Sequence, residues 1–107
     1  MRSAAFERIA VVGCGLIGGS FAVASQQVTG VTDVVVWDRD EASRKRAATL
    51  GVGTRVASDI ADAVGGAQLV LLGVPAPDLA DVARRVAPHL APGALVTDVA
   101  SVKTGAV

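Results

Sequence analysis

The chain has 107 residues, of which 51% are apolar and 3% aromatic, and its ten basic and ten acidic side chains cancel. This length suits one domain with a single hydrophobic core, and no stretch approaches the roughly 20 apolar residues of a membrane span. The balanced charge gives no electrostatic argument for a nucleic-acid or membrane partner, and the lone Cys14 excludes an internal disulfide and favours a reducing compartment.

The first predicted elements are a strand, a helix and a second strand. Residues 7–12 end in a continuous apolar run, which is typical of a strand buried on both faces. The pattern from residue 16 to about 28 is helical, and Gly30 is its predicted stop. Residues 33–38 predict a second buried strand, which ends in the acidic Asp38.

A capped helix follows. Asp40 is suited to cap a helix over residues 41–50, and Gly51 is suited to end it. Its basic side chains are expected on an exposed face: Arg44, Lys45 and Arg46. Residues 52–57 predict a short edge strand, and Ser58 or Asp59 is expected to cap a small helix that ends at Val64.

The second half of the chain continues the alternation. Residues 68–74 predict a fourth strand, and residues 78–90 a helix that kinks or ends at Pro88. Residues 94–99 predict a fifth strand, and residues 101–107 the start of another helix.

Strands and helices that alternate across short loops predict a parallel sheet with helices on both faces. We therefore expect an α/β fold, namely a Rossmann-type doubly wound sheet in three layers, which occupies residues 1–107 as one domain. Residues 1–8 place no apolar segment between their charges, so no secretory signal is predicted and we expect a cytoplasmic protein.

Three glycines in G-x-G-x-x-G spacing, Gly13, Gly15 and Gly18, lie between the first strand and the first helix. In this context the first glycine allows a tight turn, the second lets the backbone approach a pyrophosphate, and the third lets the helix pack on the sheet. Leu16 and Ile17 open the helix, where backbone N–H groups and the helix dipole attract an anion. These five residues are candidates for binding a dinucleotide.

Asp38 stands twenty positions after Gly18, the distance at which this motif places an acid on the adenosine ribose. Its charge would repel a 2′-phosphate, which favours NAD over NADP. The adjacent Arg39 keeps NADP possible because an arginine can pair with that phosphate, although it can equally stack on adenine or remain solvated.

Two reactive residue types receive less weight. Cys14 lies near a helix N-terminus that can lower a thiol pKa, but a small side chain packed under the loop is the favoured interpretation. His89 ends a helix on the side of the sheet opposite the expected ligand crevice, so we do not expect it to be a catalytic base. No metal site is predicted.

The ends of the fourth and fifth strands supply the remaining candidates. Val74 and Pro75 end the fourth strand at the crevice, where the backbone is expected to lie against the ribose or nicotinamide side of a bound cofactor. A turn from strand to helix that is merely stiffened by proline is equally compatible. Ser101 and Lys103 follow the fifth strand beside the expected nicotinamide position and are suited to hydrogen-bond a polar substrate. Equally, Ser101 is suited to cap the helix predicted there.

Three segments together resemble the N-terminal domain of the prephenate dehydrogenase family, which includes arogenate-using relatives. They are the glycine segment 12–20, the Val-Pro pair at 74–75 and the segment 97–103, whose sequence is Thr-Asp-Val-Ala-Ser-Val-Lys. The resemblance extends over about residues 8–103. It implies an NAD-dependent oxidative decarboxylation of prephenate or arogenate on the route to tyrosine.

The same resemblance assigns roles and shows a departure. The serine of the Ser-Val-Lys motif lies by the substrate hydroxyl in such enzymes, a role that falls on Ser101, with a less defined role for Lys103. Their catalytic histidine follows this motif and is absent from the 107 residues, as is the helical dimerisation domain of a homodimer. We therefore expect a cofactor-binding fragment that is nearly inactive alone. Another dehydrogenase, such as a β-hydroxyacid dehydrogenase, and a non-catalytic dinucleotide-binding module remain alternatives.

Overall fold

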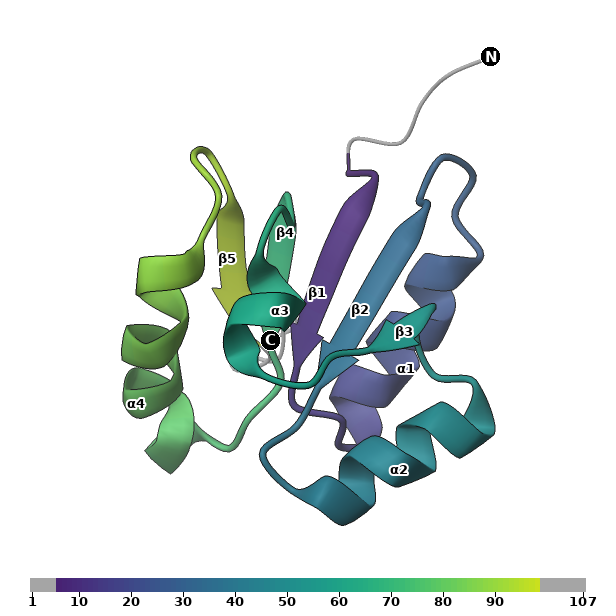
Figure 1. Cartoon of the computed structure of the whole chain (residues 1–107), viewed down its shortest axis with the longest axis horizontal. Coiled ribbons are helices and arrows are strands. Elements are labelled where there is room, and N and C mark those ends of the chain that lie inside the picture. The colour runs from purple at the N-terminus through teal and green to yellow at the C-terminus, as the bar shows by residue number, and fades with distance from the viewer. Residues whose placement is uncertain (1–5, 99–107) are drawn as a thin grey trace, which may run out of the picture.

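The computed structural model describes residues 6–98 and shows strands alternating with helices (Figure 1). In chain order the elements are β1 (Arg8–Val12), α1 (Leu16–Gln26), β2 (Asp33–Trp37), α2 (Glu41–Leu50), β3 (Arg55–Val56), α3 (Ile60–Val64), β4 (Leu69–Leu72), α4 (Ala76–Val86), the 3₁₀ turn η1 (Ala87–His89) and β5 (Leu95–Asp98). Within the described part of the chain, no helix is long and apolar enough to cross a membrane. The helix predicted over residues 101–107 lies outside the described residues.

The strands form one parallel sheet in the order β3-β2-β1-β4-β5. Val11 of β1 is in register with Val36 of β2 on one side and with Leu71 of β4 on the other. The chain leaves β1 toward β2 and later returns to β4 on the opposite side. In such sheets ligands bind beyond the carboxyl ends of the strands, at the point where the order reverses. That point lies between β1 and β4.

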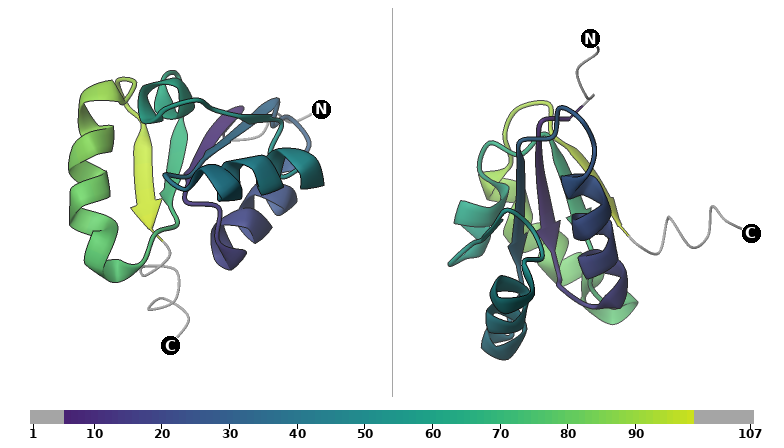
Figure 2. Two further views of the ribbon diagram at one scale, coloured as in Figure 1. Left: turned by 60° about the horizontal axis from the view of Figure 1, so that its bottom comes forward. Right: turned by 90° about the vertical axis from the view of Figure 1, so that its right-hand side faces the viewer.

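Two apolar layers cover the sheet because side chains alternate along each strand. Ile9 and Val11 of β1 pack with Ala22 of α1 and Ala47 of α2. The intervening Ala10 and Val12 belong to a second cluster, which includes Ile60 of α3 and Val82 of α4. Figure 2 shows α1 and α3 on opposite sides of the strands. This three-layer arrangement is the predicted Rossmann-type doubly wound fold.

Local signals determine where the helices begin and end. Asp40 accepts a hydrogen bond from the Ser43 N–H at 3.1 Å, and Gly51 ends α2 with a left-handed φ of 71°, both as predicted. By contrast, α1 ends at Gln26 rather than near residue 28. The helix predicted over residues 78–90 begins at Ala76, since prolines are tolerated in a first turn, and it ends at Val86.

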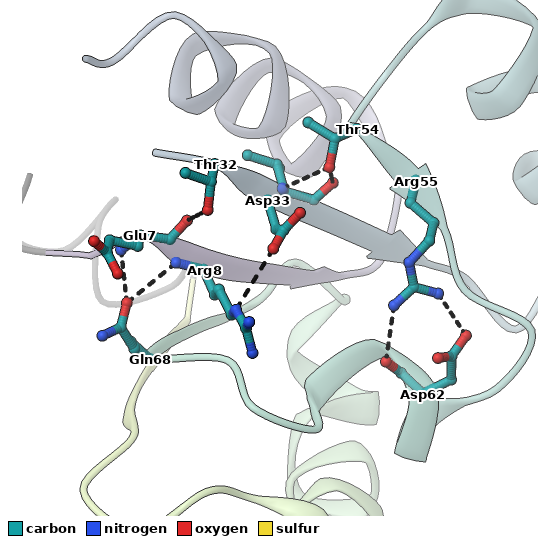
Figure 3. Close-up of polar contacts among 9 residues, drawn as sticks. Glu7, Arg8, Thr32, Asp33, Thr54, Arg55, Asp62 and Gln68 are labelled. Atoms are coloured by element: carbon teal, nitrogen blue, oxygen red, sulfur yellow. Dashed lines mark hydrogen bonds and ion pairs between the residues drawn. The ribbon is translucent and has the colours of Figure 1, made fainter. Parts of the chain in front are cut away.

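Polar contacts occupy the amino-terminal edge of the sheet. The Gln68 side-chain oxygen accepts hydrogen bonds from the backbone N–H groups of Glu7 at 2.6 Å and Arg8 at 3.1 Å (Figure 3). Arg8 also forms a 3.5 Å ion pair with Asp33 at the start of β2. These contacts hold the starts of β1, β2 and β4 together.

Candidate nucleotide-binding site

The glycine turn after β1 is held tightly against the neighbouring strands. Gly13 has a φ of +106°, which favours glycine, and its N–H donates to the Trp37 carbonyl at 2.7 Å. A Cβ on Gly13 would lie 2.6 Å from the carbonyl oxygen of Gly73. The Gly73 N–H in turn donates to the Val12 carbonyl at 2.7 Å. The end of β4 therefore lies directly against the turn and leaves no room for a side chain.

Gly15 and Gly18 have different surroundings. A Cβ on Gly18 would overlap the carbonyl oxygen of Gly13, so this glycine allows α1 to approach the turn. A Cβ on Gly15, by contrast, would have no atom within 4 Å. Gly15 is also the N-cap of α1, and among the described residues no side chain caps it. The first N–H groups of α1 lack intrahelical partners and are available to a ligand here.

The Asp38 carboxylate connects the end of β2 to the glycine turn. Its Oδ2 accepts a hydrogen bond from the Cys14 N–H at 2.8 Å, and its Oδ1 accepts one from the Asp40 N–H at 2.8 Å. The Arg44 guanidinium donates to the Asp38 carbonyl at 2.6 Å. Each carboxylate oxygen retains lone-pair capacity for a further donor. These bonds fix the acid in place without using up its ability to accept hydrogen bonds.

Arg44 corrects one sequence-based expectation. It was predicted on the exposed face of α2, but its side chain is half-buried and bonded to the backbone at Asp38. Lys45 and Arg46 are exposed as predicted. The helical pattern of α2 placed Arg44 one turn after Asp40, and the fold of the preceding loop then brings the Asp38 carbonyl within its reach.

A cavity of about 290 Å³ opens at the carboxyl edge of the sheet, between the glycine turn, the end of β2 and the start of α4. Its lining residues are Val12, Gly13, Gly15, Trp37, Asp38, Arg39, Asp40, Gly73, Val74, Pro75, Asp78, Val82 and Arg85. Across it, Arg39 and Asp78 form an ion pair with a distance of 3.4 Å between Nη2 and Oδ2. The cavity thus has an apolar floor, which includes Trp37 and Val82, and a charged rim.

Cys14 is half-buried against the cluster that contains Ala22 and Ala47. Burial, and next the negative charge of Asp38, raise the pKa of the Cys14 thiol to about 11, while Arg44 acts in the opposite direction. The helix N-terminus does not produce a reactive thiolate here. The interpretation of Cys14 as a small packed side chain is therefore the one that the structure supports.

The structure brings most of the predicted site residues together. Six of them line the one cavity: Gly13, Gly15, Asp38, Arg39, Val74 and Pro75. Gly18 packs directly behind the turn, and Leu16 and Ile17 begin α1 at the same edge. Ser101 and Lys103 lie outside the described residues. His89 is exposed in η1, which follows the last residue of α4. Figure 1 shows that this helix runs away from the carboxyl edge of the sheet.

The sequence interpretation missed several lining residues. Asp78, Val82 and Arg85 reach the cavity from one face of α4, at intervals of four and three residues. That helical spacing after Pro75 was a usable signal. Trp37 carried no such signal, although it lines the floor and its buried Nε1 has no hydrogen-bond partner among the described residues. Within those residues, no group of three or more metal-ligating side chains occurs.

A parallel doubly wound sheet with a side-chain-free turn, an uncapped helix start and an acid at the end of β2 defines a Rossmann-type nucleotide-binding domain. Residues 21–107 match the model of the prephenate dehydrogenase nucleotide-binding domain. The chain therefore belongs to the prephenate dehydrogenase family, which separates it from the β-hydroxyacid dehydrogenase alternative.

Individual relatives agree with this family. The chain is 40% identical over 102 residues to a cyclohexadienyl dehydrogenase of Zymomonas mobilis, a match that covers 95% of the chain and 35% of the relative. Synechocystis arogenate dehydrogenase superposes with a TM-score of 0.76 at 26% identity, covering 85% of this chain and 32% of that one. Prephenate dehydrogenase from A. aeolicus, solved with hydroxyphenyl propionate and NAD⁺, superposes with a TM-score of 0.76 at 25% identity. This match covers 91% of this chain and 34% of that one. The chain spans about a third of the length of these relatives.

Proposed function

We propose that the chain is the NAD-binding portion of a dehydrogenase that oxidises prephenate or arogenate. The observation that carries this proposal is the hydrogen bond between the Asp38 carboxylate and the Cys14 N–H, which supports a role for this acid as the ribose partner beside the glycine turn. The family match supports the same assignment.

The residues present fit a dinucleotide. A pyrophosphate would lie over Gly15, where no side chain intervenes, and accept hydrogen bonds from the N–H groups of Leu16 and Ile17. The adenosine ribose would donate its hydroxyls to Asp38. The cavity volume of about 290 Å³ is at the small end for ligand pockets, which suits the adenosine half alone. Gly13 and Gly18 serve by keeping the turn close to the sheet.

The charge at Asp38 favours NAD over NADP. A 2′-phosphate would lie against a carboxylate whose two oxygens already face the turn and the Asp40 N–H. Arg39 is the cation next to Asp38 in sequence, and its guanidinium pairs with Asp78, whereas that of Arg44 is bonded to the Asp38 carbonyl. Val74 and Pro75 would support the adenine side of the cavity.

For the longer protein we propose oxidative decarboxylation of prephenate or arogenate, a step toward tyrosine, by a cytoplasmic homodimer. When bound, NAD supplies the hydride acceptor. Ser101 would position the substrate hydroxyl, with Lys103 nearby, and the base would be a histidine other than His89. General acid–base catalysis contributes about a hundred- to ten-thousand-fold to rate. This chain alone is therefore expected to bind cofactor and to turn over almost no substrate.

Isothermal titration of the chain with NAD and with NADP tests the proposal. We expect saturable, one-to-one binding of NAD, weaker binding of NADP, and no measurable prephenate oxidation. His89→Ala is the matched control, since His89 lies at the other end of α4 and its loss should leave NAD affinity unchanged. Absence of saturable binding by either dinucleotide would refute the proposal.

A further inference from the structure

One ion pair bridges the two walls of the candidate cavity. Arg39 extends from the loop after β2, and Asp78 lies in the first turn of α4, with Nη2 and Oδ2 separated by 3.4 Å. Both residues line the cavity. The Arg39 side chain is 66% exposed and the Asp78 side chain 32% exposed, so the acid is the more enclosed partner.

The backbone of Asp78 is held within the first turn of α4. The Asp78 N–H donates to the Pro75 carbonyl at 2.9 Å, within the turn that begins α4. An acid in the first turn of a helix is also favoured by the helix dipole. Arg39, in contrast, is a long side chain on a loop and has many accessible rotamers. Asp78 is therefore the more enclosed partner, on a helix, and Arg39 is the partner with more accessible rotamers.

The position of Arg39 has a consequence for the cofactor. Arg39 directly follows Asp38, so its guanidinium is the cation that stands nearest in sequence to the proposed ribose site. An arginine at this place accommodates the 2′-phosphate of NADP in other nucleotide-binding domains. While the guanidinium is paired across the cavity, its Nη2 faces the Asp78 carboxylate of α4, which offsets its positive charge.

We propose that Asp78 is a specificity-determining positioning residue: by holding Arg39 against α4, it withholds the guanidinium from a 2′-phosphate and so favours NAD. This inference rests on the proposed dinucleotide-binding function. It adds a second acid, from α4, to the discrimination that Asp38 provides from β2. The two acids act differently. Asp38 would repel the 2′-phosphate directly, whereas Asp78 holds the Arg39 guanidinium that would otherwise pair with that phosphate.

The effect should be small and measurable. Exposed ion pairs contribute little free energy, which corresponds to a change of about two- to fivefold in an equilibrium constant. Asp78→Asn should therefore raise the affinity for NADP relative to NAD by about two- to fivefold at low ionic strength. Asp78→Glu retains the charge within reach of Arg39 and should keep the wild-type ratio of NADP to NAD dissociation constants.

Asp81→Asn is the matched control. Asp81 lies on the same helix and pairs with Arg84 at 3.6 Å, but it does not line the cavity. Its loss changes the net charge as Asp78→Asn does, and it should leave the dissociation-constant ratio unchanged. Thermal denaturation of each variant verifies that the fold is retained.

A double-mutant cycle with Arg39→Ala isolates the mechanism. In that background Asp78→Asn should give no further gain in NADP affinity, because no guanidinium remains to be released. An unchanged ratio in Asp78→Asn, an equal gain in Asp81→Asn, or a gain that persists without Arg39 would each overturn the inference. If the wild-type chain binds NAD while the ratio is unmoved by Asp78→Asn, only this inference fails; if it binds neither dinucleotide, the proposed function fails and the inference with it.

Discussion

The carboxylate of Asp38 accepts a hydrogen bond from the backbone N–H of Cys14 at 2.8 Å, across 24 positions of sequence. The acid that would bind the ribose is thus also a structural partner of the glycine turn that would bind the pyrophosphate. The Asp38 side chain would thus serve two purposes, because it would bind the ribose and it also holds the glycine turn in place. The geometry of one half of the site depends on the other.

Asp38→Asn should therefore weaken NAD binding by more than the loss of a ribose contact. An amide offers one acceptor oxygen, and its NH₂ group would face a backbone N–H of either Cys14 or Asp40. Hydrogen bonds to charged groups contribute about 1.5–3 kcal/mol, so we expect a loss of about tenfold or more in affinity, measured by titration. Asp33→Asn, at the opposite end of β2, is the control and should bind NAD normally. Equal affinity of Asp38→Asn and the wild type would contradict the assignment.

Alanine substitutions at Gly13 and Gly15 should have different effects: the first should lower the stability of the fold, and the second should weaken NAD binding. Gly13→Ala combines a φ of +106° with a Cβ 2.6 Å from the Gly73 carbonyl, so the free energy of unfolding should fall by about 1–3 kcal/mol or more. Gly15→Ala meets no atom within 4 Å at a φ of −68°, so its free energy of unfolding should fall by much less than that of Gly13→Ala. Its methyl group would nevertheless occupy the space of the pyrophosphate. Normal NAD affinity in Gly15→Ala would show that no ligand approaches the turn closely.

Cys14 should be a slow nucleophile. Burial, followed by the charge of Asp38, raises its pKa to about 11 from an ordinary value of 9.0, so the rate of iodoacetamide alkylation should still be rising at pH 10. In Asp38→Asn the pKa should fall but remain above 9.0, since burial is the larger cause. Mass spectrometry of alkylation against pH measures both values. A rate plateau below pH 9 would contradict this account.

Acid should destabilise the fold through Asp62. The hydrogen bond from Arg55, 2.7 Å from Asp62 (Figure 3), lowers the pKa of this carboxyl below its ordinary 3.8. Its stabilising contribution is therefore complete above the unfolded value and is lost as pH falls through the lowered folded value. The difference in unfolding free energy between the wild type and Asp62→Asn should shrink as pH falls below about 4. NMR titration of Arg55→Met should show the Asp62 pKa closer to 3.8; an unchanged pKa would exclude Arg55 as the cause.

Much of the fold could be predicted because its signals are local. The bounds of α2 follow from Asp40 and Gly51, which act within one helical turn of their positions. The parallel direction of the strands follows from the alternation of strands and helices across short loops. The helix α4 begins at Ala76 rather than at the expected Asp78, because Pro75 and Pro77 are both compatible with the start of a helix.

The site was predictable where its residues belong to a spaced motif, follow it directly as Arg39 does, or end a strand at the crevice as Val74 and Pro75 do. The three glycines and Asp38 could be found in this way, since the βαβ unit imposes their separation. The Arg44 contact with the Asp38 carbonyl and the Arg39–Asp78 ion pair could not. Both depend on the direction that a long side chain takes across a loop, and that direction is set by tertiary packing.

The most direct test of the central claim is an ¹⁵N-resolved NMR titration of this chain with NAD. A dinucleotide that lies over the glycine turn and against Asp38 should shift the backbone N–H signals of Gly15 to Gly18 and of Asp38 to Asp40 most strongly. Shifts confined to the amino-terminal edge of the sheet around Gln68, or to η1 around His89, with none in the glycine turn, would contradict it.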